Sequence, residues 1–155
     1  MDTENKILEQ LTQKFSVLKD KARVQRQKRI FAEAPLENFF EVLEYAKEEL
    51  EFSILIALTG LDEGTNLGFI YHLAREDGIT LNLKITAAKD GPSIKSVTEY
   101  YQGAEIYERE AIDLLGARIE GLKEGKRYPL PDGWPRGHYP LRKDWNAGML
   151  KNKEA

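Results

Sequence analysis

The sequence contains no cysteine and only two histidines among its 155 residues. Without cysteine the chain can form no disulfide bond, which fits an intracellular setting. It also offers no thiolate ligand for an iron–sulfur cluster or a nickel–iron centre. For this chain we expect no bound cofactor and no bound metal.

The two histidines do not form a recognisable metal site. His72 lies in a strand-like segment and His138 in a proline-rich one. Neither has a ligand-type neighbour at a spacing known from zinc sites. The interpretation of both as ordinary structural residues is therefore favoured over ligation.

Long hydrophobic runs are also missing. The longest one, Ile54 to Leu58, is far shorter than the roughly 20 residues that a membrane-spanning helix needs. The N-terminus is polar and acidic, unlike a signal peptide. A net charge of −3 argues against a general nucleic-acid or membrane-surface binder, although local basic clusters remain possible.

Proline is scarce until the last part of the chain, where four of the six prolines lie. Because proline interrupts helices, residues 126–155 are predicted to be an extended tail rather than a separate domain. The tail carries large aromatic side chains that are common anchors in interfaces. The aromatic residues are Tyr128, Trp134, Tyr139 and Trp145. Residues 1–125 are expected to form one domain whose core is complete without the tail.

The remaining chain predicts an α+β fold with an antiparallel or mixed sheet of three to four strands covered by helices. Helical spacing of apolar residues is found in residues 3–20 and 35–50. Residues 52–59, 67–74 and 79–87 have strand character and follow one another through short turns, as in a meander. The basic run from Lys21 to Arg29 is interpreted as an edge strand, because lysines there suppress pairing between molecules. Nucleic-acid binding is the weaker alternative, since no aromatic residues interleave with the basic ones.

A third helix is predicted from Ser96 to Leu115. Ser96 and Glu99 have the spacing of a capping box, and Gly116 suits a left-handed C-cap. Gly103 is a weak point at which the segment could divide. Glu108 falls inside the apolar stripe, or at its solvent-exposed edge if the stripe is narrower. Because an unpaired buried charge is costly, we expect Glu108 to be structurally paired rather than catalytic.

The carboxylates of this helix allow two interpretations. Clustered acids can work as acid–base pairs, so a small stand-alone enzyme using the Glu105–Asp113 cluster is one hypothesis. However, Arg109 lies four residues from both Glu105 and Asp113, and such spacing favours salt bridges on an exposed helix face. Catalysis is therefore the less favoured interpretation.

The tail ends in a proline-stiffened basic segment. Arg142, Lys143 and Asp144 follow Pro140 and Leu141. We interpret the segment as a basic hook held by an apolar anchor, because a pre-extended chain loses less entropy on docking.

Several of these motifs together resemble the family of the thirty-kilodalton subunit of complex I. The family also has members in energy-converting nickel–iron hydrogenases and related membrane-bound complexes. The blocks that carry the resemblance are Glu108-Arg109-Glu110, Asp113-Leu114-Leu115-Gly116, Pro131-Asp132-Gly133-Trp134 and Pro140-Leu141-Arg142-Lys143-Asp144, closing at Trp145. Leu122 stands where respiratory members usually carry histidine, and the segment Trp134–Trp145 is longer than theirs. Both departures resemble the hydrogenase-type branch.

The resemblance implies a cofactor-free, non-catalytic subunit that docks on the large catalytic subunit, with an iron–sulfur subunit as a further partner. The complex would be peripheral on the cytoplasmic side of the membrane. The equivalent subunit of respiratory NADH:quinone oxidoreductase is the alternative. The expected partner-binding residues are Glu108, Arg109, Glu110, Asp113, Trp134, Tyr139, Pro140, Leu141, Arg142, Lys143, Asp144 and Trp145.

Overall fold

The structure is a computed structural model that describes residues 2–151, and it divides into two compact units. The first unit comprises Met1–Thr59 with Phe69–Thr86, and the second comprises Gly60–Gly68 with Ala87–Ala155. Residues 126–151 therefore belong to the same unit as the third long helix. No helix within residues 2–151 is long and apolar enough to cross a membrane.

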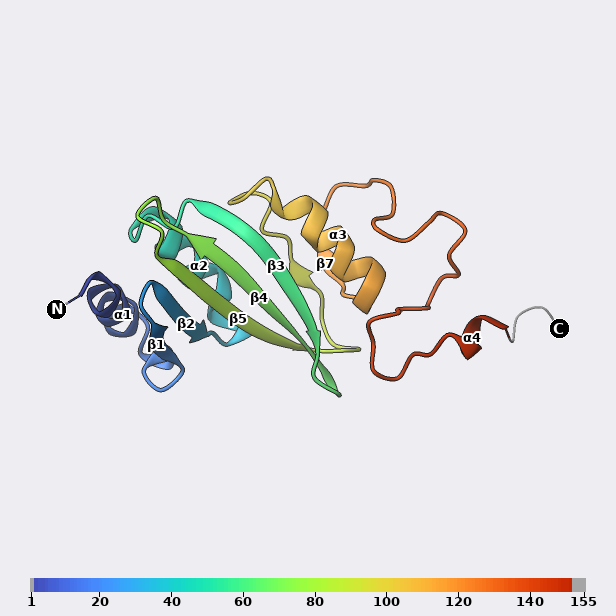
Figure 1. The fold of residues 1–155 in the computed structure, drawn as a ribbon, viewed down its shortest axis with the longest axis horizontal. Helices are drawn as coiled ribbons and strands as arrows, with labels where there is room; N and C mark the ends of the chain where they lie inside the picture. The colour runs from blue at the N-terminus through green and yellow to red at the C-terminus, as the bar shows by residue number, and fades with distance from the viewer. Residues whose placement is uncertain (1, 152–155) are drawn as a thin grey trace. The chain divides into compact units, whose positions relative to one another are not determined.

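The main sheet has five strands in the order β1-β2-β5-β4-β3 (Figure 1). The strands are β1 (Ala22–Arg26), β2 (Arg29–Glu33), β3 (Ile54–Asp62), β4 (Asn66–Ala74) and β5 (Thr80–Ala88). β1 pairs with β2 antiparallel, whereas β2 pairs with β5 in parallel, so the sheet is mixed. The predicted α+β class is confirmed, but the expected number of strands was too low. The prediction missed β2, because this short segment follows directly on the basic run and its parallel partner is distant in the sequence.

The three long strands form the predicted meander. β3 and β4 are joined by residues 63–65, and β4 and β5 by residues 75–79, which are turns too short for a parallel crossover. In β5 every second side chain, from Leu81 to Ala87, is buried, and the intervening ones are only half-buried. This alternation is what a sheet with one covered face requires.

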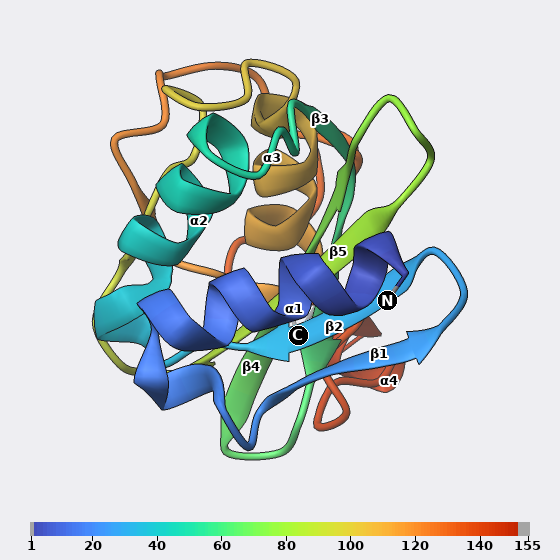
Figure 2. The same cartoon turned by 90° about the vertical axis from the view of Figure 1, so that its left-hand side faces the viewer.

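In the first unit, α1 (Thr3–Lys14) packs against β1 and β2 (Figure 2). Asp2 caps the helix, because its side chain accepts a hydrogen bond from the backbone N–H of Asn5 at 3.1 Å. The 3-10 turn η1 (Ser16–Leu18) follows α1. The second predicted helix divides into a 3-10 turn, η2 (Leu36–Asn38), and α2 (Phe39–Glu48).

Large apolar side chains from these helices and strands form the core of the first unit. Phe39 and Tyr71 lie with their ring centroids 4.7 Å apart, and both are almost fully buried. The other large buried side chains of this unit are Leu11, Leu18, Ile30, Leu43, Leu50, Phe52, Phe69, Leu73, Leu81 and Leu83. Leu11 of α1 and Ile30 of β2 both belong to this core.

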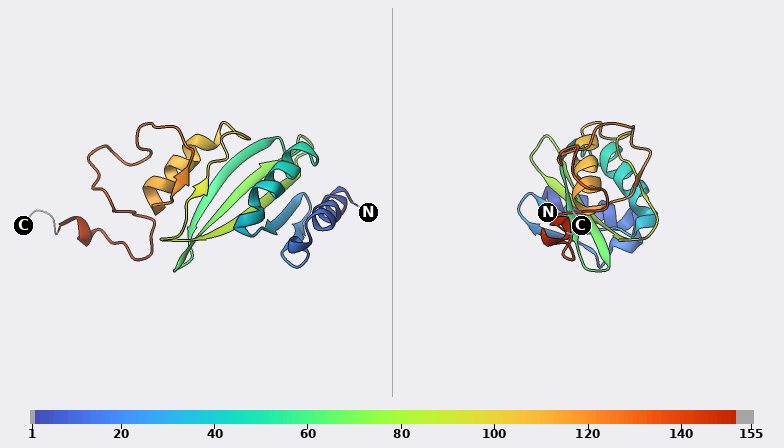
Figure 3. Two further views of the ribbon diagram at one scale, coloured as in Figure 1. Left: turned by 180° about the vertical axis from the view of Figure 1, so that it is seen from behind. Right: turned by 90° about the vertical axis from the view of Figure 1, so that its right-hand side faces the viewer.

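The second unit contains α3 (Ala104–Leu115), the parallel strand pair β6 (Ile94–Lys95) and β7 (Ile119–Glu120), and the short helix α4 (Gly148–Lys151). Between β7 and α4 the chain follows an irregular path (Figure 3). The predicted start of α3 at Ser96 was wrong, because the helix begins eight residues later, directly after the weak point at Gly103. The predicted left-handed C-cap is confirmed, since Gly116 has φ 69°.

Candidate functional site

Glu108 occupies the centre of the second unit and is fully buried. One carboxylate oxygen accepts the Ser96 hydroxyl at 2.7 Å, and the other accepts the backbone N–H of Val97 at 2.8 Å. Ser96 therefore does not cap a helix as predicted. It joins the loop before α3 to a carboxylate in the middle of α3.

Burial raises the pKa of Glu108, while the hydrogen bonds from Ser96 and Val97 act in the opposite direction. A raised pKa could suit a general acid, but the carboxyl group is enclosed and both of its oxygens already have donors. Glu108 was expected to be structurally paired rather than catalytic, and its carboxylate pairs with Ser96 and Val97 of the loop before α3. Its expected role in partner binding stays a prediction.

The salt bridges on α3 differ in part from those predicted. Arg109 pairs with Glu105 at 2.9 Å, as expected, and also donates to the backbone carbonyl of Lys123. Asp113 does not pair with Arg109. It accepts Arg127 Nε at 2.8 Å and the backbone N–H of Leu130 at 3.0 Å, so it holds the beginning of the tail against α3.

Glu110 is the remaining acidic residue that was expected to bind a partner. It is half-buried, and its side-chain carboxylate has no hydrogen bond or ion pair within residues 2–151. Its expected role in partner binding stays a prediction.

The segment from Tyr139 to Arg142 closes the C-terminal end of α3. A side chain at Gly116 would meet the Tyr139 ring at 2.6 Å, so glycine allows this close approach. The backbone N–H of Leu141 donates to Leu114 O at 3.0 Å, and Arg142 Nε donates to Leu115 O at 2.7 Å. α3 has no basic residue in its last turn, and Arg142 supplies the missing positive charge at that helix end.

Asp62, at the end of β3, holds the next residue of the tail. Its carboxylate lies 2.7 Å from Lys89 Nζ and accepts the backbone N–H groups of Lys143 and Gly64, both at 2.8 Å. Burial alone would raise the pKa of Asp62, but the hydrogen bonds from Lys89, Lys143 and Gly64 and the charge of Lys89 lower it from 3.8 to about 2. Asp62 is therefore ionised at neutral pH and binds the tail from within the same unit.

The aromatic residues of the tail also interact with each other. Trp134 Nε1 donates to the His138 carbonyl at 2.8 Å, and Trp145 Nε1 donates to His138 Nδ1 at 3.2 Å. The two tryptophan rings lie 5.8 Å apart between centroids. These contacts bend the tail back on itself, so it is not the fully extended chain that its prolines suggested.

Three side chains in or directly after the closing segment take no part in these contacts. Leu141 is 56% exposed, and the side chains of Lys143 and Asp144 are exposed as well. Pro140 is half-buried just before them. Since the backbone and Arg142 fix this segment on α3, the three exposed side chains are displayed in a defined position. We call Leu141, Lys143 and Asp144 the tail surface.

Among the described residues, no group of three His, Asp or Glu side chains could hold a metal ion. Every buried side-chain nitrogen or oxygen of residues 2–151 has a hydrogen-bond partner.

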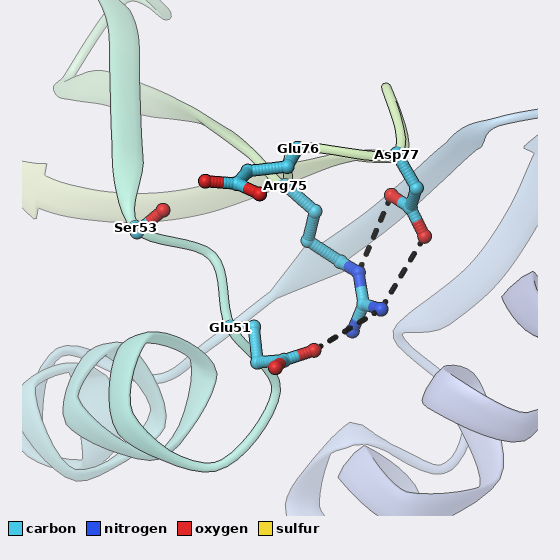
Figure 4. A pocket seen from close by; sticks show the side chains of 5 residues that line it. All are labelled: Glu51, Ser53, Arg75, Glu76 and Asp77. Atoms are coloured by element: carbon cyan, nitrogen blue, oxygen red, sulfur yellow. Dashed lines mark hydrogen bonds and ion pairs between the residues drawn. The ribbon is translucent and has the colours of Figure 1, made fainter.

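One hollow in the first unit, of about 390 Å³, is lined by charged residues (Figure 4). The guanidinium group of Arg75 lies in this hollow. It donates to Leu50 O at 2.7 Å and pairs with Glu51 at 3.4 Å and with Asp77 at 3.3 Å. These partners use the donors of Arg75, which therefore ties the β4–β5 turn to the end of α2 rather than binding a ligand.

Sequence reasoning identified the residues of the tail and of α3 but missed several of their partners. Asp62, Lys89 and Arg127 were not among the predicted site residues. Their partners lie 14 to 81 residues away along the chain, so no local spacing could have revealed them.

The chain matches the family described as respiratory-chain NADH dehydrogenase, 30 Kd subunit, over residues 32–149. It is 37% identical over 144 residues to a subunit of the F(420)H(2) dehydrogenase of Methanosarcina mazei, covering 91% of this chain and 90% of that protein. It is 30% identical over 134 residues to the beta subunit of the membrane-bound hydrogenase of Pyrococcus furiosus, covering 80% and 76%.

A solved structure, that of the membrane-bound sulfane sulfur reductase, an archaeal respiratory membrane complex, contains a chain of the same fold. The TM-score is 0.83 at 24% identity, covering 99% of this chain and 93% of that one. The chain belongs to the 30-kDa subunit family of respiratory-chain NADH dehydrogenase, as the motifs predicted. Members of this family are subunits of oxidoreductase complexes, which supports a subunit role over a stand-alone enzyme.

Proposed function

We propose that this chain is a cofactor-free subunit that docks on the large catalytic subunit of a complex I-like electron-transfer complex. An iron–sulfur subunit of the same complex is the second proposed partner. The complex would lie peripherally on the cytoplasmic side of the membrane. The parent complex belongs to the group that includes F(420)H(2) dehydrogenase and membrane-bound hydrogenase, whose subunits have sequences related to this chain.

The fixed display of the tail surface carries this proposal. Leu141 is more than half exposed and stands between residues whose backbone groups are already bonded, so a partner that covers it gains buried apolar area. A segment that is already ordered loses little conformational entropy when a partner covers it. An apolar anchor flanked by exposed charges is also typical of interface hot spots.

The contacts of Glu108, Asp113 and Asp62 support the same function indirectly. These three buried or nearly buried carboxylates bind backbone groups of the loop before α3 and of the tail. They use their charge to hold loops in place and not to act on a substrate. Electrons would therefore pass through the partner subunits.

The replacement Leu141→Asp tests the proposal, with Val17→Asp as its matched control. Both side chains are exposed, Leu141 by 56% and Val17 by 41%, so neither replacement should unfold the chain. Val17 lies in η1 of the first unit, whereas Leu141 lies in the tail surface. Each variant is expressed with an affinity tag in the native host, and the proteins that copurify from solubilised membranes are quantified.

Leu141→Asp should reduce the copurified large subunit about tenfold or more, because a buried unpaired charge costs several kcal/mol at an interface. Val17→Asp should leave its amount unchanged. Circular dichroism of both free variants checks the fold. Full recovery of the large subunit with Leu141→Asp would overturn the role of the tail surface, and purification of the wild-type chain without any partner would overturn the proposed function.

A further inference from the structure

The hairpin formed by β1 and β2 concentrates positive charge in a chain whose net charge is −3. Residues 19–29 contain six basic residues and one acidic residue. Five of the basic residues, Lys21, Arg23, Arg26, Lys28 and Arg29, lie on or beside the hairpin, and we call them the basic hairpin surface. Within residues 2–151, no carboxylate lies within 4.0 Å of a charged group of these five.

Edge protection explains only part of this charge. β1 is the edge strand of the sheet, as the sequence predicted, and basic residues on it discourage pairing with other molecules. However, Arg29 belongs to β2, which has neighbours on both sides. Arg29 is also the direct cross-strand partner of Arg26, and like charges in such positions destabilise a hairpin. An external anion bound at the two arginines would neutralise this repulsion.

The hairpin is held in a fixed shape. Lys28, in its turn, has φ 58°, a left-handed conformation that is uncommon for lysine. The backbone N–H of Lys28 donates to the buried Glu4 carboxylate of α1 at 2.6 Å, and Lys28 O accepts the backbone N–H of Thr80 at 3.0 Å. The guanidinium carbon of Arg23 lies 4.8 Å from the centroid of the Phe31 ring, which also orders that side chain.

A hollow of about 530 Å³ lies at the hairpin tip. It is lined by residues 26–29 and Gly78. Lys28 Nζ is held there by Asp77 O at 2.8 Å, and one nitrogen of Arg29 by Lys28 O at 2.9 Å. The other guanidinium nitrogens of Arg29, and all those of Arg26, have no hydrogen bond among the described residues. Two neighbouring guanidinium groups with open donors beside a hollow suit a carboxylate side chain.

We propose that the basic hairpin surface binds an acidic segment of a second protein subunit of the complex. The inference rests on the proposed function, because it takes the partner from the same assembly. Arginine forks bind carboxylates bidentately, and the hollow would receive an acidic side chain, whereas a flat bilayer surface would leave it empty. Single-stranded nucleic acid suits the surface less, since its one aromatic ring, Phe31, is already covered by Arg23.

Carbodiimide coupling in the purified complex tests this contact directly. The reagent joins an amine to a carboxylate that touches it without adding a spacer. Mass spectrometry should find Lys21 or Lys28 joined to an Asp or Glu of another subunit. Absence of such products, in a complex where other lysines of this chain do couple to its neighbours, would overturn the inference while leaving the proposed function intact. Failure to purify any complex would instead count against the proposed function.

The replacement Arg26→Glu separates docking from folding. A glutamate opposite Arg29 turns a repulsive cross-strand pair into an attractive one, so the free chain should be at least as stable as the wild type. Docking should nevertheless weaken. The double variant Arg23→Glu/Arg26→Glu should weaken docking about fivefold to thirtyfold and lower the salt concentration at which the chain leaves the complex.

The control Lys6→Glu/Lys95→Glu makes the same charge change at exposed lysines outside the hairpin and should leave docking unchanged. Equal losses in both double variants would reduce the effect to net charge and overturn the inference. Flotation with vesicles of equal parts phosphatidylglycerol and phosphatidylcholine examines the lipid alternative. The hairpin would be assigned to the membrane instead if Arg23→Glu/Arg26→Glu abolished binding to these vesicles but left docking in the complex unchanged.

Discussion

Replacing Asp62 with asparagine should detach the tail from the end of β3. The change keeps the size of the side chain but removes the negative charge that faces Lys89 at 2.7 Å. It also replaces one carboxylate oxygen by an N–H₂ group, which cannot accept the backbone N–H of Lys143. The ion pair between Asp62 and Lys89 and the hydrogen bond that joins Asp62 to Lys143 of the tail are therefore lost together.

The size of the effect follows from the pKa of Asp62. Each pKa unit corresponds to about 1.4 kcal/mol, so a fall from 3.8 to about 2 stabilises the folded chain by at most about 2.5 kcal/mol at neutral pH. Screening of the nearby charges by solvent reduces this to about 1–2 kcal/mol. Because this pKa shift already contains the hydrogen bond from Lys143, we expect Asp62→Asn to lower the free energy of unfolding by about 1–2 kcal/mol in all.

The pH dependence gives a second check. The pKa of Asp62 is lower in the folded chain, so its contribution is complete above pH 3.8 and is lost as the pH falls towards 2. The difference in stability between wild type and Asp62→Asn should shrink over that range. Asp132→Asn is the matched control, because Asp132 is exposed and has no hydrogen bond or ion pair within residues 2–151, and it should change stability by less than about 0.5 kcal/mol.

Urea unfolding measures these free energies, and amide hydrogen exchange reports the tail itself. In Asp62→Asn the amide of Lys143 should exchange faster than in the wild type, while the amides of α1 should be unaffected. An unchanged stability together with a still protected Lys143 amide would refute the assignment of Asp62 as the residue that holds the tail.

Two further predictions concern the buried parts of the second unit. Glu108→Gln should change stability by less than about 1 kcal/mol at neutral pH, because the amide can still accept a hydrogen bond from Val97 and donate one to Ser96. Glu108→Ala should lower stability by about 2–4 kcal/mol, because it leaves the Val97 N–H unpaired. Since burial raises the pKa of Glu108, Glu108→Gln should gain stability relative to the wild type as the pH rises from about 4 to 7. Urea unfolding across this pH range measures the difference, and the opposite trend would contradict the buried position of Glu108. Gly116→Ala should lower the free energy of unfolding by about 2–4 kcal/mol, because Gly116 has a positive φ and its added methyl group would meet Tyr139. Gly103→Ala should be neutral or slightly stabilising, because Gly103 has φ −63° and open space around it. Equal thermal shifts of the two variants would count against the C-cap assignment.

Local patterns in the sequence predicted most of the fold. The spacing of Ile7, Leu11 and the other apolar residues of α1, and the alternation in β5, depend on near neighbours only. β2 was missed because its pairing with β5 joins residues about fifty positions apart, such as Ile30 and Leu81. A parallel pairing of this kind has no local signature.

The candidate site was predicted in its residues but not in its contacts. Glu108 was placed correctly in the apolar stripe, since helical periodicity fixes which face a residue occupies. Its partners, Ser96 and Val97, belong to a loop that was expected to be helical. Arg142 was expected to reach a partner chain, but one of its nitrogens binds the end of α3. α3 has no basic residue in its own last turn, so its terminal carbonyl groups can accept from an arginine elsewhere in the chain. Only the folded chain shows that this arginine is Arg142.

Purification of the wild-type chain from its native membranes shows whether this protein is a docking subunit. The proposed subunit should elute with a large catalytic subunit and an iron–sulfur subunit in equal amounts, and this sample should absorb visible light through its clusters. The same chain produced alone should be colourless and should turn over no substrate. A chain that elutes without partners, or that shows redox turnover by itself, would contradict the assignment of this protein as a docking subunit.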